Sequence, residues 1–270
     1  FFMEISYRVI DMSSEMNEDV LSETGTIPLQ HGDSFQFRCH PGVPCYLNCC
    51  HKLELRLYPY DILCLRKKLS CSSGEFLERY TRLGAGVHPY FPAVMLNMAE
   101  SDEAPCPFLT EAGCSVYTDR PSACRTYPVE RGVGKEGRGA KLKSQYSLVR
   151  HPYCKGHEEE HSCTIRQWKR EQRLDAYNLF NDLWAEVDAF FAGDPWQGEG
   201  HAGPRQQLAF MVCYNIDAFR AYCSENRLSK QYRIDRDRRR RIERDDAELL
   251  KFGFDWLLHV LGNEKTLRPR

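Results

Sequence analysis

The stretch that most constrains this chain is residues 37–50, F-R-C-H-P-G-V-P-C-Y-L-N-C-C, which holds Cys39, Cys45, Cys49 and Cys50. Neighbouring side chains point to opposite sides of a strand, or about 100° apart on a helix. Cys49 and Cys50 therefore do not easily bind one metal ion together. Their adjacency indicates either two neighbouring centres or one multinuclear cluster.

The composition is that of an ordinary soluble protein. The 270 residues are 42% hydrophobic and 28% charged, enough for one large domain or a domain with an extension. The formal net charge of −1 gives no overall electrostatic case for nucleic acid or membrane, and no apolar run reaches the length of a membrane span. The thirteen cysteines are odd in number and no export signal precedes them, so we expect a cytoplasmic protein.

The remaining cysteines of interest also lie in turn-rich segments. Free structural cysteines behave as small hydrophobes and belong in a core, so this placement favours ligation. Structural zinc typically uses pairs separated by two to four residues, and only Cys45 and Cys49 have that spacing. Ligands gathered from several loops suit an iron–sulfur cluster, and we keep zinc as the alternative. The candidate metal ligands are Cys39, Cys45, Cys49, Cys50, Cys106, Cys114, Cys124 and Cys154.

A buried cluster of thiolates needs its negative charge compensated. A four-thiolate zinc site and an oxidised four-iron cluster each carry a charge of about −2, which is costly to bury alone. Arg120 and Arg125 flank Cys124 and are the candidates for that role, with backbone N–H groups of the proline-rich loops. His40 and His51 flank the first cysteine stretch and are expected to support the site rather than to ligate.

Several of these motifs occur in a known order. The F-x-C of residues 37–39, the cysteines at 45, 49 and 50, the C-P-F-L of residues 106–109 and the C-S-V-Y-T-D-R-P-S-A-C-R-T-Y-P of residues 114–128 resemble the bacterial cysteine-cluster family called YkgJ. The resemblance covers roughly residues 37–175 and implies a zinc- or iron-chelating domain that binds metal through the eight cysteines. Similar patterns occur in flagellin lysine N-methylases, which implies a second possibility, an iron–sulfur-dependent protein methyltransferase.

The pattern predicts a mostly α-helical fold with irregular cysteine-rich loops and a few short strands. We divide the chain into an N-terminal extension at 1–38, a metal-binding domain at 39–163 and a helical part at 164–270. Apolar periodicity predicts helices at 164–191, 204–224 and 245–261. Alternation predicts a strand at 53–57, and the segment 131–139 is expected to be a loop or hairpin tip.

Three motif matches are better explained without chemistry. The H-E-E-E-H of residues 157–161 lacks the helical surroundings of a zinc protease, and the G-V-G-K-E-G of residues 132–137 lacks those of a dinucleotide site. The second match lies in a segment whose Lys135, Arg138, Lys141 and Lys143 form at most a local basic patch. The arginine-rich segment 233–246 is interleaved with acids and is expected to be a salt-bridged helix.

The expected function is therefore that of an iron–sulfur protein with one or two 4Fe–4S clusters, engaged in redox, electron-transfer or assembly work. The alternatives are the methyltransferase, which alone would use S-adenosylmethionine, and a structural zinc module for protein interaction. We expect a protein partner and neither membrane nor nucleic-acid binding. Whether the protein is an enzyme is left open at this stage.

Overall fold

The computed structural model describes residues 3–5, 26–30, 32–135 and 142–270 of the chain. Much of the expected 131–139 tip lies outside these residues, as do Arg138 and Lys141 of the local basic patch. The described chain forms two compact units. Unit 1 comprises Phe1–Leu55, Met98–Tyr117 and Ser122–Asn178, and unit 2 comprises Arg56–Asn97, Thr118–Pro121 and Leu179–Arg270. The division into 1–38, 39–163 and 164–270 stays a prediction.

Unit 2 is built mainly from helices whose ends the sequence specifies. Pro59 occupies the first turn of α2, and the Asp61 carboxylate accepts the N–H of Tyr58 at 2.9 Å. Ser72 and Glu75 cap α3 reciprocally, as a capping box does. The helices are α2 (Pro59–Lys68), α3 (Ser73–Tyr80), most of α6 (Leu174–Phe191), α7 (Pro204–Tyr214), α8 (Ile216–Glu225), α9 (Leu228–Gln231), α10 (Arg236–Arg244) and α11 (Asp246–Gly262).

Close packing of α11 against α7 and α8 depends on one glycine. A Cβ atom at Gly253 would lie 2.7 Å from Cγ1 of Val212 and 2.9 Å from Cε1 of Phe219. Val212, Phe219 and Phe252 are fully buried beside it. The predicted helix at 245–261 is therefore confirmed as α11, and the absence of a side chain at Gly253 lets it approach its neighbours.

Two predicted helices are each interrupted. The segment 164–191 forms α5 (Ile165–Glu171) and α6, separated where Arg173 adopts a φ of 52°. The segment 204–224 forms α7 and α8, because the Asn215 side chain accepts the N–H of Ala218 and so caps a new helix. Apolar spacing continues through both breaks, so periodicity alone does not reveal them.

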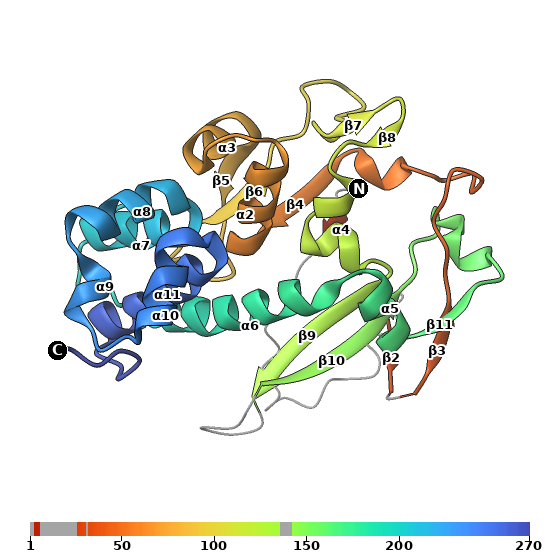
Figure 1. Ribbon diagram of the computed structural model, residues 1–270. Helices are drawn as coiled ribbons and strands as arrows, with labels where there is room; N and C mark the ends of the chain where they lie inside the picture. Colours follow the sequence, from red (N-terminus) through yellow and green to blue (C-terminus); the bar gives the residue numbers. More distant parts are fainter. Residues whose placement is uncertain (1–2, 6–25, 31, 136–141) are drawn as a thin grey trace. The chain divides into compact units, whose positions relative to one another are not determined.

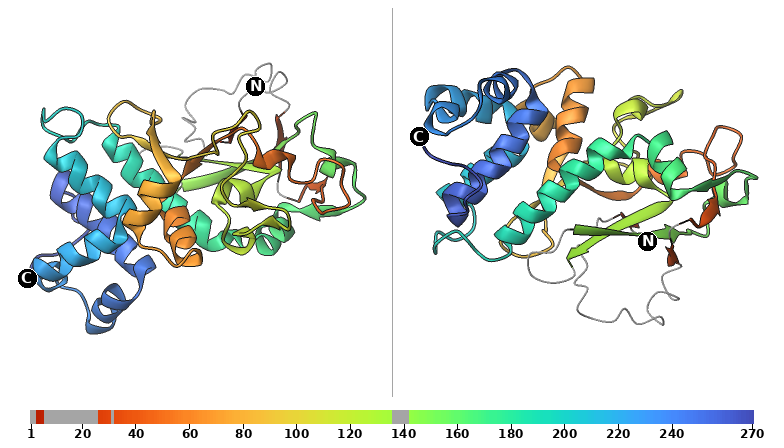
Figure 2. Two further views of the ribbon diagram at one scale, coloured as in Figure 1. Left: turned by 90° about the horizontal axis from the view of Figure 1, so that it is seen from above. Right: turned by 60° about the horizontal axis from the view of Figure 1, so that its bottom comes forward.

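Unit 1 combines short strands with turn-rich loops (Figure 1). β10 (Leu142–Val149) pairs antiparallel with β2 (Thr26–Leu29) on one side and β9 (Val129–Lys135) on the other. Figure 2 shows β9 and β10 as a long hairpin from two further sides. The antiparallel pairing up to Lys135 and Leu142 agrees with the hairpin alternative for 131–139, whereas the loop alternative is wrong for the first residues, because Gly132 and Gly134 lie in β9. The other strands are β3 (Ser34–Gln36) with β11 (Ser162–Thr164) and β7 (Leu109–Thr110) with β8 (Gly113–Cys114).

The predicted strand at 53–57 is confirmed as β4 (Leu53–Leu57). It begins in unit 1, where β1 (Met3–Ile5) pairs with it in parallel, and it ends in unit 2. There Arg56 and Leu57 pair with β6 (Ala93–Leu96), which also pairs with β5 (Thr81–Gly84). Its buried residues are Leu53, Leu55 and Leu57, so the alternation in the sequence does mark one buried face.

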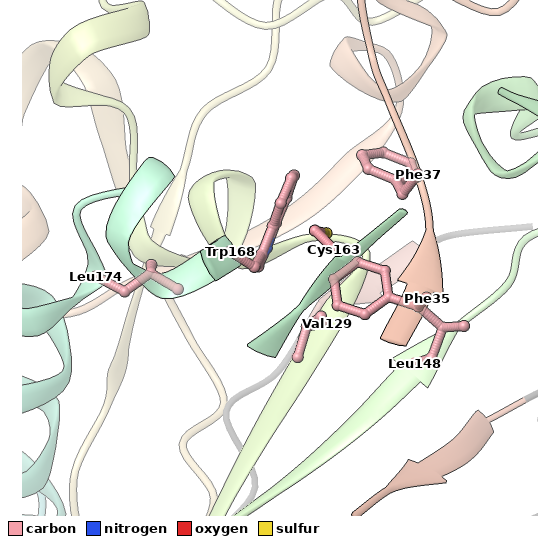
Figure 3. Packing of buried hydrophobic residues seen from close by; sticks show 7 residues of the cluster. All are labelled: Phe35, Phe37, Val129, Leu148, Cys163, Trp168 and Leu174. Carbon is pink, nitrogen blue, oxygen red and sulfur yellow. The ribbon is translucent and has the colours of Figure 1, made fainter. Parts of the chain in front are cut away.

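A seven-residue core cluster holds unit 1 together (Figure 3). Trp168 on α5 meets the rings of Phe35 and Phe37 edge-on, and its indole N–H donates to the Thr126 carbonyl at 2.9 Å. The core cluster consists of Phe35, Phe37, Val129, Leu148, Cys163, Trp168 and Leu174. Taken together, the described residues form more helix than strand, so the predicted fold class is confirmed. None of the described helices has both the length and the apolar character needed to cross a membrane.

Candidate metal centre

The first cysteine loop is a succession of tight turns. Backbone N–H groups of Val43, Tyr46, Asn48 and Cys50 each donate to the carbonyl three residues earlier, at 2.9–3.0 Å. The last of these turns is the 3-10 helix η1 (Asn48–Cys50). Such turns bury few side chains, and the four thiols of the loop are exposed or half-buried. The thiols of this proline- and glycine-containing loop are therefore accessible to a bound group.

Backbone hydrogen bonds join the second cysteine segment directly to the first. The N–H of Cys106 donates to the carbonyl of Cys50 at 2.7 Å. His51 and Pro105 form an isolated antiparallel β-bridge beside it. The pKa of Cys106 is raised to about 11, mainly by burial, and the thiols of Cys114 and Cys49 contribute to the rise. β7 and β8 form the small hairpin that carries Cys114. Cys49, Cys50, Cys106 and Cys114 therefore share one environment.

The adjacent cysteines differ in protonation. A hydrogen bond from the Cys50 thiol lowers the pKa of Cys49 to about 7, although burial opposes the change. The same hydrogen bond is the largest cause that raises the pKa of Cys50, and burial is the next largest. Negative charge on Cys49, Cys124 or Cys106 raises the pKa of Cys50 as well, which brings Cys124 into the group. In the metal-free protein Cys49 is thus the first of the pair to become a thiolate.

Cys45 and Cys154 form the other side of the candidate centre. The N–H of Lys155 donates to the sulfur of Cys45 at 3.0 Å, and the Cys45 thiol lies beside Cys154. Burial raises the pKa of Tyr153, and the thiols of Cys49, Cys154 and Cys45 raise it further. Tyr153 thus lies beside Cys45 and Cys154 and also beside Cys49. Cys49 therefore joins Cys45 and Cys154 to the group of Cys50, Cys106 and Cys114.

Tyr46 and Tyr127 also border the cysteines. Burial is the largest cause that raises the pKa of Tyr46, and the side chains of Cys39, Tyr117, Cys50 and Cys114 raise it as well. Cys39 therefore lies beside the group that includes Cys50 and Cys114. Burial also raises the pKa of Tyr127, with Cys154 as the next cause. The buried Tyr127 hydroxyl faces Cys154 without a well-formed hydrogen bond to any described atom. Sequence reasoning did not single out these tyrosines, and the only signal is their position next to cysteine motifs.

The structure thus brings all eight candidate ligands into one neighbourhood of unit 1. Their chemistry fits a thiolate-bound metal group, because the atoms that converge there are sulfurs on loops that are separate in sequence. Among the described residues, no three His, Cys, Asp or Glu side chains are arranged as the ligands of a single ion. The assignment of the eight cysteines as ligands therefore stays a prediction.

The two candidate arginines have different surroundings. Arg125 is buried on α4 (Ser122–Thr126), where it donates to the Gln172 carbonyl at 2.8 Å and lies 4.6 Å from the ring centre of Tyr177. Arg120 is half-buried in the segment Thr118–Pro121, which belongs to unit 2. Their role in compensating cluster charge also stays a prediction.

Cysteines outside the pattern occupy packing positions. Cys163, a reserve ligand by its nearness to Cys154 in the sequence, belongs to the core cluster and is 2% exposed. Cys213 is buried in α7, as its helical position predicts. Cys64 lies in α2 but is half-buried, and the thiol of Cys71 donates to the Arg66 carbonyl at 3.8 Å. Cys163 and Cys213 therefore behave as small hydrophobes, whereas Cys64 and Cys71 lie in unit 2 and are only half-buried.

The H-E-E-E-H segment has a structural role. It begins in the 3-10 helix η3 (Lys155–Glu158) and does not form the α-helix that a zinc protease requires. His157 packs on Phe37, with ring centres 5.1 Å apart. Glu159 accepts a hydrogen bond from Nε2 of His40 at 2.9 Å, while Nδ1 of His40 accepts the N–H of Gly42. His40 therefore ties the first cysteine loop to the segment after Cys154, which agrees with a supporting role.

Comparison with known proteins gives a family match for the segment that holds the cysteines. Residues 38–155 match the family model CxxCxxCC, described as a "putative zinc- or iron-chelating domain". The match covers a little under half of the chain. All eight candidate ligands lie in the CxxCxxCC segment, so the expectation of a metal-binding cysteine cluster, for zinc or iron, is confirmed at that level. No curated protein and no solved structure matches the chain.

Proposed function

We propose that the CxxCxxCC segment binds an iron–sulfur cluster of the 4Fe–4S type, in one or two copies, and serves electron transfer or cluster assembly. The proposed ligands come from Cys39, Cys45, Cys49, Cys50, Cys106, Cys114, Cys124 and Cys154. When bound, such a cluster supplies one-electron redox chemistry. None of the thirteen cysteines, all of which lie within the described residues, is in a disulfide, which supports a cytoplasmic location.

The position of Cys49 and Cys50 supports iron–sulfur over a single zinc ion. Cys50 lies with Cys106 and Cys124, whereas Cys49 also borders the tyrosines beside Cys45 and Cys154. A single tetrahedral ion has four ligand positions, and its sulfurs all lie about 2.3 Å from one centre. Eight thiols spread over two linked groups suit a larger inorganic core, or two cores that lie side by side.

The chain's own groups would adjust such a cluster. The Lys155 N–H already points at the sulfur of Cys45, and hydrogen bonds to ligand sulfurs stabilise the more reduced, more negative state. Tyr46, Tyr127 and Tyr153 line the cysteines with aromatic surface, which limits water at the sulfurs. The hydrogen bond would raise the reduction potential of a bound cluster, whereas the exclusion of water would lower it, because a dry surface disfavours the more negative, reduced state.

Anaerobic purification followed by metal analysis tests the proposal. We expect a coloured protein with iron and sulfide in equal amounts and a visible band that dithionite bleaches. A colourless protein with stoichiometric zinc would refute it and favour the zinc alternative, which the family description also allows.

Single substitutions test the ligand assignment. Cys49→Ser and Cys50→Ser should each lower iron and sulfide content, because both sulfurs are proposed ligands. Cys223→Ser, at a half-buried thiol of α8 in unit 2, is the matched control and should leave the content unchanged. Unchanged content in both cluster variants would remove the adjacent pair from the ligand set. Saturable binding of S-adenosylmethionine would be needed to support the methyltransferase alternative.

A further inference from the structure

A second candidate site lies beside the core cluster in unit 1. A cavity of about 1040 Å³ opens between α5 and the strands β2 and β10, and we call it the α5 cleft. Leu29, Tyr146 and Ile165 line it and pack against the core cluster, so they provide an apolar floor. The volume is at the upper end for small-molecule sites, and polar residues make up most of the lining. These properties suit an extended ligand more than a compact one.

The wall that α5 contributes is cationic. Arg166, Lys169 and Arg170 all line the α5 cleft. Lys169 lies 3.8 Å from Asp175, a carboxylate with 87% of its side chain exposed, so their ion pair is weak. Arg166 and Arg170 are exposed and make no ion pair within the described part of the chain. The cleft therefore presents positive charge that the described residues leave largely uncompensated.

The facing wall offers hydrogen-bonding groups. Ser144 accepts two hydrogen bonds from the buried Arg131 guanidinium, at 2.9 Å and 2.6 Å, so its own hydroxyl proton is available to an acceptor in the cleft. β2 ends at Leu29, opposite Tyr146, whereas Ser144 and Gln145 pair with β9 only, among the described residues. Among the described residues this edge of β10 has no paired strand beyond Tyr146, and an edge of that kind suits an added strand.

We propose that the α5 cleft binds an extended, acidic segment of a partner protein. Its carboxylates would pair with Arg166, Lys169 and Arg170, its alternate apolar side chains would lie on Leu29, Tyr146 and Ile165, and its backbone would pair with β10 near Ser144. Such a segment uses all three properties of the cleft, namely the cationic wall, the apolar floor and the open strand edge. The proposal concerns the class of partner and holds for either metal in the neighbouring centre.

A labelled peptide provides the test with the full chain. The probe is a fluorescent peptide of about eight alternating Glu and Leu residues, about 26 Å long when extended. We expect saturable binding at low ionic strength, measured by anisotropy, that weakens as salt is added. Replacing all Glu by Gln, or all Leu by Ala, should each weaken binding roughly tenfold. Absence of saturable binding of the parent peptide overturns the proposal.

Two charge-reversal variants locate the binding. Arg166→Glu with Arg170→Glu should weaken binding of the parent peptide roughly tenfold or more. Arg236→Glu with Arg244→Glu makes the same charge change at exposed arginines of α10 in unit 2, and it should leave binding within about twofold. Equal loss in both variants would show unspecific attraction to basic surface and overturn the proposal. Tighter binding of a single-stranded RNA through Arg166 and Arg170 would assign the cleft to nucleic acid instead.

Discussion

Phe37 links the core cluster to the candidate centre, and its replacement by leucine should weaken both stability and metal retention. The residue is 3% exposed, and its ring centre lies 5.5 Å from that of Tyr127 and 5.6 Å from that of Trp168. It precedes Cys39 by two residues, while Tyr127 borders Cys154. The Phe37→Leu substitution keeps most of the apolar area but removes the ring contacts.

The contacts set the expected magnitude. Edge-to-face aromatic pairs contribute about 0.5–1.5 kcal/mol each beyond area burial, so the loss of two pairs costs about 2 kcal/mol of unfolding free energy. For a chain of this size that corresponds to a fall in Tm of about 6 °C. Loosening Tyr127 beside Cys154 should lower metal affinity roughly tenfold, as changes next to metal ligands commonly do.

Phe219→Leu in unit 2 is the matched control. Phe219 is fully buried and has aromatic ring partners of its own, Phe252 at 6.5 Å and Trp256 at 6.0 Å. Thermal unfolding followed by circular dichroism should show similar destabilisation for both variants, whereas competition with a chelator should show weaker metal retention for Phe37→Leu only. Equal metal retention in the two variants would refute a link between the core cluster and the centre.

Three further outcomes are expected. Gly253→Ala should destabilise unit 2 by about 1–3 kcal/mol in urea unfolding, because the added methyl group would lie 2.7 Å from a valine side chain. The control Gly74→Ala on α3 should not destabilise the protein, because its methyl group would meet only an amide nitrogen at 3.7 Å. Glu159→Gln should speed metal release to a chelator about twofold by weakening the bond to His40, and an unchanged rate would show that this bond does not support the loop. In metal-free protein, alkylation of Cys49 followed by mass spectrometry should rise with pH through about 7, because the lowered pKa makes half of it thiolate there; a midpoint near 9 would contradict the hydrogen bond from its neighbour.

Local signals in the sequence were enough to predict much of the fold. Ser72 and Glu75 identify the start of α3, and Pro59 with Asp61 identifies the start of α2, since each depends on residues within one helical turn. The breaks at Arg173 and Asn215 were not predicted, because apolar side chains continue across them at helical spacing. Gly132 and Gly134 favour a loop locally, but pairing with β10 holds them in a strand.

The candidate centre was predictable as a set of cysteines but not as an arrangement. The position of thiols in turn-rich backbone indicates ligation, and their gathering in unit 1 agrees with it. The bond between His40 and Glu159 joins residues 119 positions apart, and no local pattern announces such a contact. The same holds for Tyr127, whose approach to Cys154 depends on how two separate loops fold.

The core cluster has neighbours of two kinds, because Tyr127 and Cys154 pack on it as well as Leu29, Tyr146 and Ile165. The core cluster thus supports both the candidate centre and the α5 cleft. A bound metal that orders the core cluster therefore also changes the affinity of the α5 cleft for its ligand. Thermodynamic reciprocity requires that a ligand in the cleft change the metal affinity by the same factor. A partner that binds more tightly to the loaded protein would then slow loss of the metal for as long as it stays bound.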